Sequence, residues 1–110
     1  MKLILAIVHS EDGNKVLSTL NEAGFSVTKL ATTGGFLRAG NTTLLTGVED
    51  EKLEHCLEII EGLCKSRKQL INSNIGAFDA SISAAAHSNI EIMIGGATVF
   101  VMNIEEFKKY

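Results

Sequence analysis

Phe25-Ser-Val-Thr-Lys-Leu-Ala31 and Thr42-Thr-Leu-Leu-Thr-Gly-Val48 are two short runs typical of β-strands. The stretch that joins them, Ala31-Thr-Thr-Gly-Gly-Phe-Leu-Arg-Ala-Gly-Asn-Thr-Thr43, is therefore a hairpin connection. Hairpin loops usually need about 2–5 residues, so this connection is longer than a reversal of the chain requires. Its glycines, short polar side chains, single aromatic residue and single arginine suit a loop whose backbone a polar ligand approaches closely.

The residues before this hairpin predict a strand and a helix. Leu3–Val8 is a continuous apolar run, typical of a strand covered on both faces. The following helix is expected to be capped by Ser10 or Asp12 and to end at Gly24 in a left-handed conformation. Its buried stripe is expected to contain the apolar residues spaced at i, i+1, i+4 and i+7: Val16, Leu17, Leu20 and Ala23.

A second helix is expected to begin near Asp50. Acidic residues stand at its positive end, and Lys65, Arg67 and Lys68 suit its negative end. The residues expected on its inner face are Leu53, Cys56, Leu57, Ile60 and Cys64. Gln69–Asn89 has no clear period and is interpreted as a long connection, in which a short helix through Ile82–Ala86 is one option.

The last strand is strongly marked. Ile90, Ile92 and Ile94 alternate, Gly95-Gly96 interrupts the pattern, and Ala97–Met102 resumes it. A glycine pair within a strand indicates a bulge, or a close approach by another backbone or a ligand. Ile104–Tyr110 is expected to form a closing helical turn.

The resulting order, βαββαβ, predicts one α+β domain over residues 1–110 with a ferredoxin-like antiparallel sheet and both helices on one face. Leu3–Val8 and Ala97–Met102 nevertheless carry apolar side chains on both faces. An uncovered apolar sheet face is unusual in a monomer, so we expect copies of the chain to bury it in a cyclic oligomer.

Composition narrows the kinds of partner. The chain has 110 residues and a net charge of −3, so no general attraction to nucleic acid or acidic lipid is expected. Its apolar beginning is shorter than the core of a signal peptide, and no run approaches the ~18 residues of a membrane span. Two unpaired cysteines, Cys56 and Cys64, fit a reducing compartment, so a cytoplasmic location is expected.

The hairpin predicts a binding face. If Ala31 lies opposite Thr42, then Thr28 lies across from Leu45 and Ser26 across from Gly47. One face then carries Ser26, Thr28, Thr43, Leu45 and Gly47, and the other carries Val27, Ala31, Leu44 and Val48 and is expected to meet the helices. An adenine-like ring fits the first face, with Asn41 reading its edge and Phe36 stacking on it.

Other interpretations of the loop stay open. Phe36-Leu37 also suits a local hydrophobic plug or a contact with a neighbouring subunit. Gly35–Thr42 resembles a phosphate-binding P-loop, but Asn41 stands where the lysine is needed and a strand follows instead of a helix. What remains is an anion-binding nest of backbone N–H groups, with Lys29 and Arg38 as the nearest cations.

No catalytic or metal-binding pattern is found. His9, His55 and His87 have no metal-ligand spacing with each other or with the cysteines. Nucleophile motifs are absent as well, so we expect neither an enzyme nor a bound cofactor.

Two stretches carry a family resemblance. Lys29-Leu-Ala-Thr-Thr-Gly-Gly-Phe-Leu-Arg-Ala-Gly-Asn-Thr-Thr43 and Gly95-Gly-Ala-Thr-Val-Phe-Val-Met102 closely resemble the PII-like cyclic-di-AMP receptor proteins of Gram-positive bacteria. The resemblance implies a homotrimer of ferredoxin-like subunits that binds cyclic-di-AMP between neighbours without catalysis. We expect such a sensor to signal to an unidentified protein effector. It assigns ligand contacts to Thr28, Gly35, Phe36, Leu37, Asn41 and Gly47. Further candidate contacts are Ser26, Lys29, Arg38 and Gly96.

This chain departs from the family pattern at two places. Ser26 stands where the family commonly has an arginine that meets a phosphate of the ligand. Asn72–Asn89 lacks the proline and tyrosine usual in the family's long loop and holds one glycine, Gly76. The alternatives to a sensor are therefore a trimeric interaction scaffold that has lost the nucleotide and, more remotely, an enzyme that acts on a nucleotide.

Overall fold

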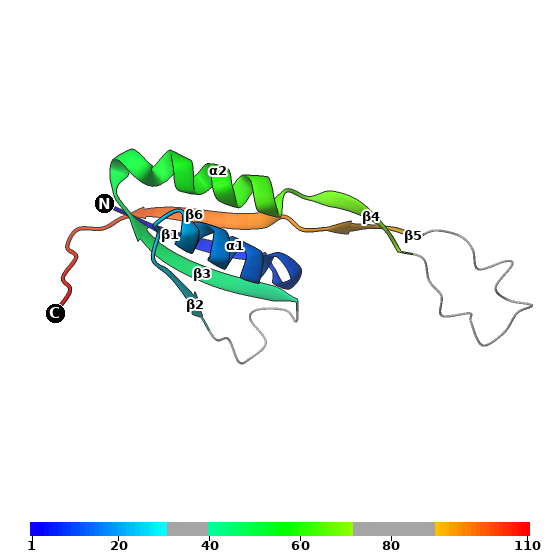
Figure 1. Cartoon of the computed structure of the whole chain (residues 1–110), viewed down its shortest axis with the longest axis horizontal. Helices are drawn as coiled ribbons and strands as arrows, with labels where there is room; N and C mark the ends of the chain where they lie inside the picture. The colour runs from blue at the N-terminus through cyan, green and yellow to red at the C-terminus, as the bar shows by residue number, and fades with distance from the viewer. Residues whose placement is uncertain (31–39, 72–89) are drawn as a thin grey trace, which may run out of the picture.

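The first strand is the centre of the molecule. The computed structural model describes residues 1–30, 40–71 and 90–110. In it β1 (Lys2–His9) pairs antiparallel with β3 (Asn41–Val48) on one side and β6 (Ala97–Asn103) on the other. With β2 (Val27–Leu30) beside β3, the sheet has the order β2-β3-β1-β6. This is the predicted ferredoxin-like arrangement (Figure 1).

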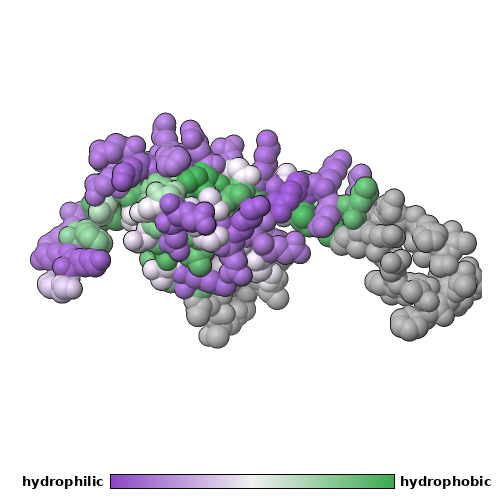
Figure 2. All heavy atoms as spheres, in the orientation of Figure 1, coloured by the Kyte–Doolittle hydropathy of each residue, from purple (hydrophilic) through white to green (hydrophobic). Residues whose placement is uncertain are grey.

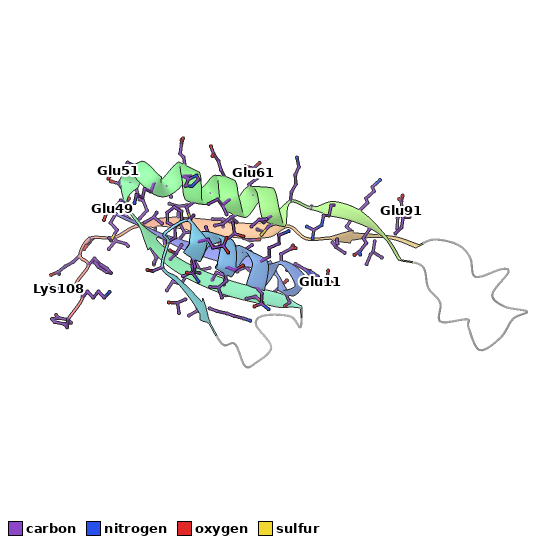
Figure 3. All side chains as sticks on the ribbon, in the orientation of Figure 1. Glu11, Glu49, Glu51, Glu61, Glu91 and Lys108 are labelled. Atoms are coloured by element: carbon purple, nitrogen blue, oxygen red, sulfur yellow. The ribbon has the colours of Figure 1, made fainter. Side chains whose placement is uncertain are left out.

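Two helices cover one face of this sheet. They are α1 (Ser10–Glu22) and α2 (Leu53–Cys64), the latter preceded by a 3₁₀ turn at Asp50–Lys52. Along β1, residues Ile4, Ala6 and Val8 are at most 1 % exposed, and the residues between them are half-buried. The core comprises these residues with Val16, Leu20, Phe25, Leu44, Val48, Cys56, Ile60 and Cys64. Hydrophilic side chains follow the outer side of α2 (Figure 2), and Glu61 of this helix is exposed (Figure 3).

The predicted register of the central hairpin is confirmed. Thr28 lies opposite Leu45, and Val27 lies opposite Thr46. The face that carries Leu44 and Val48 meets the helices, as their burial shows. Register is specified here because a slip by one residue would turn these apolar side chains away from the core.

The predicted cap of α1 is wrong. His9 occupies the N-cap, and its Nδ1 accepts a hydrogen bond from the Glu11 amide at 3.4 Å. Ser10 is held by β3 instead, because its amide donates to the Gly40 carbonyl (2.6 Å) and its Oγ lies 3.4 Å from the Thr42 hydroxyl. At the other end, Gly24 has the expected left-handed φ of 94°.

The connection predicted over Gln69–Asn89 is wrong at its start, because Gln69–Ile71 belong to a strand, whereas the strand after it begins at Ile90 as predicted. β4 (Arg67–Ile71) and β5 (Ile90–Ile94) form a separate two-stranded sheet, the arm, which extends beyond the end of α2 (Figure 1). Arg67 and Lys68 therefore lie in a strand, not at the end of a helix. The option of a helix through Ile82–Ala86 lies outside the described residues.

The glycine pair ends one strand and begins another. Gly95 and Gly96 have φ of 81° and 93°, which divides the single predicted strand into β5 in the arm and β6 in the main sheet. The expected close approach is confirmed, because the Gly96 amide donates to the Cys64 carbonyl. A Cβ on Gly95 would lie 3.0 Å from the Lys65 carbonyl oxygen and 2.7 Å from Arg67 Nη1.

An ion pair fixes the base of the arm to α1. Arg67 Nη2 lies 2.8 Å from Asp12 Oδ1, and Nη1 lies 3.4 Å from Oδ2. The Asp12 side chain is only 8 % exposed, so removal of Arg67 would leave a buried acidic side chain without this partner. The same hydrogen bond raises the pKa of Arg67.

The predicted closing turn at Ile104–Tyr110 is wrong. These residues form neither helix nor strand. Seven residues are too few for a stable helix without tertiary support. The Ile104 amide instead donates to the Met1 carbonyl at 3.2 Å, which keeps the chain beside β1 as it leaves the sheet.

The glycine turn gives a matched pair of stability predictions. Gly95→Ala is expected to lower the free energy of unfolding by about 1–3 kcal/mol, because alanine is strained at positive φ and its Cβ would crowd the Lys65 carbonyl. Gly62→Ala has open space in α2 and is expected to raise it by about 0.5–1 kcal/mol. Urea denaturation of both variants is the measurement, and equal stability of the two would contradict the role of the Gly95 turn.

Candidate functional site

The open sheet face carries a hollow of about 430 Å³ at the start of β2 and the end of β3. Three predicted ligand residues line it: Ser26, Thr28 and Gly47. Its floor includes Leu45 and Leu3, and Leu3 is paired with Gly47 across β1 and β3. The structure therefore brings together residues that the hairpin pattern had placed on one face.

Local structure fixes the polar side of this hollow. The Thr46 hydroxyl donates to the Ser26 carbonyl at 2.6 Å and ties the entry of β2 to β3. Phe25, 7 % exposed, anchors the same segment in the core, and its amide donates to the Leu20 carbonyl at 2.9 Å. Gly47 is exposed, and a Cβ there would meet only Ile104 Cδ1 at 3.8 Å. The absence of a side chain at Gly47 therefore leaves space on this side of the hollow.

Sequence reasoning missed the residues that close the hollow. Ile104 and Phe107 of the C-terminal segment and Lys52 of the 3₁₀ turn all line it. They lie far from the hairpin in sequence, so a local pattern gives no signal for them. Lys52 adds a positively charged side chain to the lining, and Glu49 adds a negatively charged one. The Met1 ammonium forms a hydrogen-bonded ion pair with the Asp50 carboxylate at 3.1 Å. That hydrogen bond lowers the pKa of Asp50.

A second, more polar hollow of about 350 Å³ lies at the opposite end of the same strands. It is lined by the predicted residues Asn41 and Gly96, together with Ile7, Gly95, Ala97 and Thr98. Asn41 begins β3 and is exposed. Its neighbours Gly95 and Gly96 are the turn at the base of the arm, so this hollow lies where the main sheet and the arm join.

Of the remaining predicted residues, the structure describes only Lys29, which lines neither hollow. Lys29 lies opposite Leu44 on β3 and therefore shares the helix-side face, away from Thr28. Gly35, Phe36, Leu37 and Arg38 lie outside the described residues.

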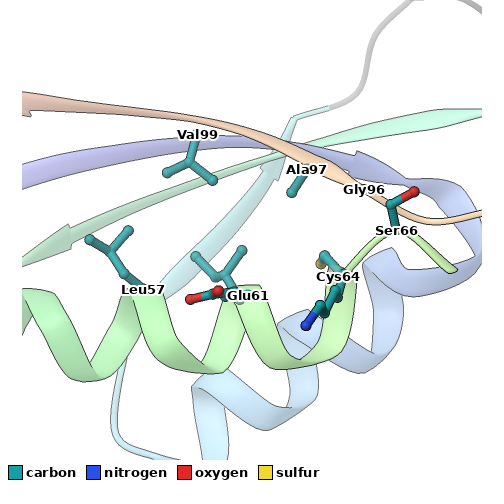
Figure 4. A pocket seen from close by; sticks show the side chains of 9 residues that line it. Leu57, Glu61, Cys64, Ser66, Gly96, Ala97 and Val99 are labelled. Carbon is teal, nitrogen blue, oxygen red and sulfur yellow. The ribbon is translucent and has the colours of Figure 1, made fainter.

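A third hollow, of about 450 Å³, separates α2 from β6 (Figure 4). Its lining is largely apolar and includes Leu57, Cys64 and Val99, with Glu61 at the helix (Figure 4). Of the predicted ligand residues that the structure describes, only Gly96 borders it. This hollow lies on the helix side of the sheet, so it is separate from the two on the open face.

Histidines and cysteines in the described part of the chain have structural roles. His9 caps α1, and the His55 ring lies 6.0 Å from that of Phe25. Within residues 1–30, 40–71 and 90–110, no group of three or more His, Cys, Asp or Glu could hold a metal ion. No helix in these ranges is long and apolar enough to cross a membrane.

Burial of the thiols gives a pH prediction. Burial raises the pKa of Cys56 and of Cys64 to about 11, and the Asp12 carboxylate adds to the effect at Cys64. Because the folded protein prefers the neutral thiols, their stabilising contribution is complete below pH 9 and is lost as the pH rises towards 11. We expect a fall in unfolding free energy over this range that is smaller in a Cys56→Ala/Cys64→Ala variant. Identical slopes in urea denaturation would contradict it.

The fold and the hollows define a ferredoxin-like domain whose open sheet face carries two cavities beside a glycine-rich hairpin. The chain belongs to the cyclic-di-AMP receptor family, because the model of that family matches residues 1–110, the whole chain. Membership suggests a protein that binds a nucleotide messenger rather than an enzyme.

A solved structure shares this fold. It is the crystal structure of a functionally unknown protein from Pediococcus pentosaceus ATCC 25745, with 33 % sequence identity and a TM-score of 0.77. The match covers 99 % of this chain and 96 % of that one. The resemblance therefore extends over the arm and the main sheet alike.

Proposed function

We propose that this protein is a cytoplasmic, homotrimeric sensor that binds cyclic-di-AMP on the open sheet face and signals to a protein effector. The observation that carries the proposal is the hollow in which Ser26, Thr28 and Gly47 meet, in a chain that matches the cyclic-di-AMP receptor family throughout. Hydroxyl groups beside an apolar floor suit a nucleotide, whose base needs both stacking area and hydrogen-bonding groups on its edge.

The presence of a second hollow on the same face supports a ligand that is large enough to occupy both hollows. Asn41, which offers an amide donor and acceptor, lines that hollow on the same strand as Gly47. A cyclic dinucleotide carries two bases and two phosphates, so it can use both hollows of one face. Ordering of the hairpin connection over 33–41 by the ligand would then change the surface offered to an effector.

A trimer is supported by what the helices leave uncovered. Leu3, Leu5 and Ile7 are half-buried on the open face, and Phe100 and Met102 are 50 % and 42 % exposed beside them. These apolar side chains from two neighbouring strands, β1 and β6, form a surface that another copy can bury. Ligand sites on this face would then lie at the boundaries between subunits.

Calorimetric titration with cyclic-di-AMP, cyclic-di-GMP and ATP tests the proposal. We expect binding heat with cyclic-di-AMP and none comparable with the other two. Silence with all three by a protein that is still trimeric would favour the interaction scaffold, to which Ser26 and the altered long loop point. Formation of a nucleotide product would favour an enzyme.

Gly47 offers a test that separates ligand contact from folding. Gly47→Ala is expected to leave the melting temperature nearly unchanged, since the added Cβ meets only Ile104 Cδ1 at ordinary contact distance. It is expected to weaken cyclic-di-AMP binding about tenfold or more, because the methyl group fills space that the ligand needs. Unchanged affinity in calorimetry would remove Gly47 from the site.

Ser26 offers the opposite test, a gain of affinity. Ser26 is exposed and lines the hollow, so Ser26→Arg places a cation where a phosphate of the ligand is expected. A hydrogen bond to a charged group contributes roughly 1.5–3 kcal/mol, which corresponds to about ten- to a hundredfold tighter binding. Ser26→Met, of similar length without charge, is the control. Equal affinities of the two variants would argue against a phosphate at this position.

A further inference from the structure

Among the described residues, one buried hydroxyl on β3 has no hydrogen-bond partner. Thr43 is 4 % exposed, and its Oγ1 makes no hydrogen bond in the part of the chain that the structure describes. The two other buried threonines of this strand do have partners: Thr42 Oγ1 lies 3.4 Å from Ser10 Oγ, and Thr46 donates to the Ser26 carbonyl at 2.6 Å. A buried polar group without a hydrogen bond is unfavourable for the folded state and is rare in native proteins.

The position of Thr43 is informative. It lies on the open face between Asn41, which lines one hollow, and Leu45, which lines the other. Its cross-strand neighbours are Ile7 on β1 and Leu30 on β2. Asn41 and Leu45 are four residues apart, a distance of roughly 14 Å along an extended strand. A ligand that contacts both hollows on this face must therefore cross Thr43.

We infer that the Thr43 hydroxyl is a specificity-determining contact that gains its hydrogen bond from cyclic-di-AMP as the ligand spans the two hollows. This inference rests on the proposed function. A hydroxyl can donate to a phosphate oxygen or accept from an adenine amino group, so either part of the ligand can satisfy it. Leu30, the cross-strand neighbour of Thr43 on the edge strand β2, is 37 % exposed, which leaves its side chain room to turn outwards when the ligand arrives.

The energetic consequence distinguishes this contact from an ordinary core threonine. In the free protein the unsatisfied hydroxyl opposes folding, whereas valine has nearly the same shape and no polar atom to bury. In the complex the same hydroxyl makes a hydrogen bond that valine cannot make. Thr43→Val is therefore expected to stabilise the free protein and to weaken the complex, two effects of opposite sign from one substitution.

The experiment compares the full-length wild-type protein with Thr43→Val, Thr43→Ser and Thr42→Val. For Thr43→Val we expect a melting temperature a few degrees higher without ligand and cyclic-di-AMP affinity about five- to tenfold lower by calorimetry. Thr43→Ser keeps the hydroxyl and is expected to retain most of the affinity. Thr42→Val makes the same change on the opposite face of the strand and is expected to gain no stability and to keep its affinity.

The outcomes separate the inference from the proposed function. If the wild-type protein does not bind cyclic-di-AMP at all, the proposed function fails and the inference fails with it. If the wild-type binds and Thr43→Val binds equally well, only the inference fails. If light scattering shows that Thr43→Val dissociates the oligomer, the missing partner of the hydroxyl belongs to a neighbouring copy, and the inference is again overturned.

Discussion

The structure depends on the packing of two helices against one side of a sheet whose central strand is apolar on both sides. On one side of β1, α1 and α2 bury Ile4, Ala6 and Val8. On the other side, Leu3, Leu5 and Ile7 are half-exposed. Burial of the first set holds the domain together. The second set leaves an apolar surface, and the two hollows of the open face border it. The apolar surface that a second copy is proposed to cover is therefore also the surface that carries the proposed ligand site.

A second constraint is the departure of the arm from the main sheet. The chain turns at Gly95 and Gly96, is held by the Gly96 hydrogen bond to Cys64, and is tied to α1 through Arg67 and Asp12. Ser10, near Asp12 in α1, is in turn bonded to Gly40 at the end of the hairpin connection. A contiguous set of contacts thus runs from the hairpin connection to the base of the arm. A ligand held at Asn41 would touch the glycines of that turn, which gives binding a physical route to the arm.

The structural features that depend on short-range periodicity could be predicted from the sequence. The alternation of residues in the hairpin was sufficient to assign the Thr28–Leu45 register and the face that carries Ser26 and Gly47. It failed where distant segments decide the outcome. β4 exists because it pairs with β5 across the long connection, and its sequence Arg-Lys-Gln-Leu-Ile has no strand pattern of its own. Ile104 and Phe107 join the site only because the C-terminal segment leaves the sheet beside β1. The unpartnered Thr43 hydroxyl was likewise invisible in the sequence, since partnership depends on three-dimensional neighbours.

The proposed trimer requires copies of this chain to cover one another's open sheet faces. Sedimentation equilibrium at micromolar concentration tests it most directly. We expect a mass of about 35 kDa, three times the 11.8 kDa of one chain, and a shift towards the single-chain mass when Phe100, exposed on that face, is replaced by Asp. A wild-type protein that sediments with the mass of one chain would contradict the account.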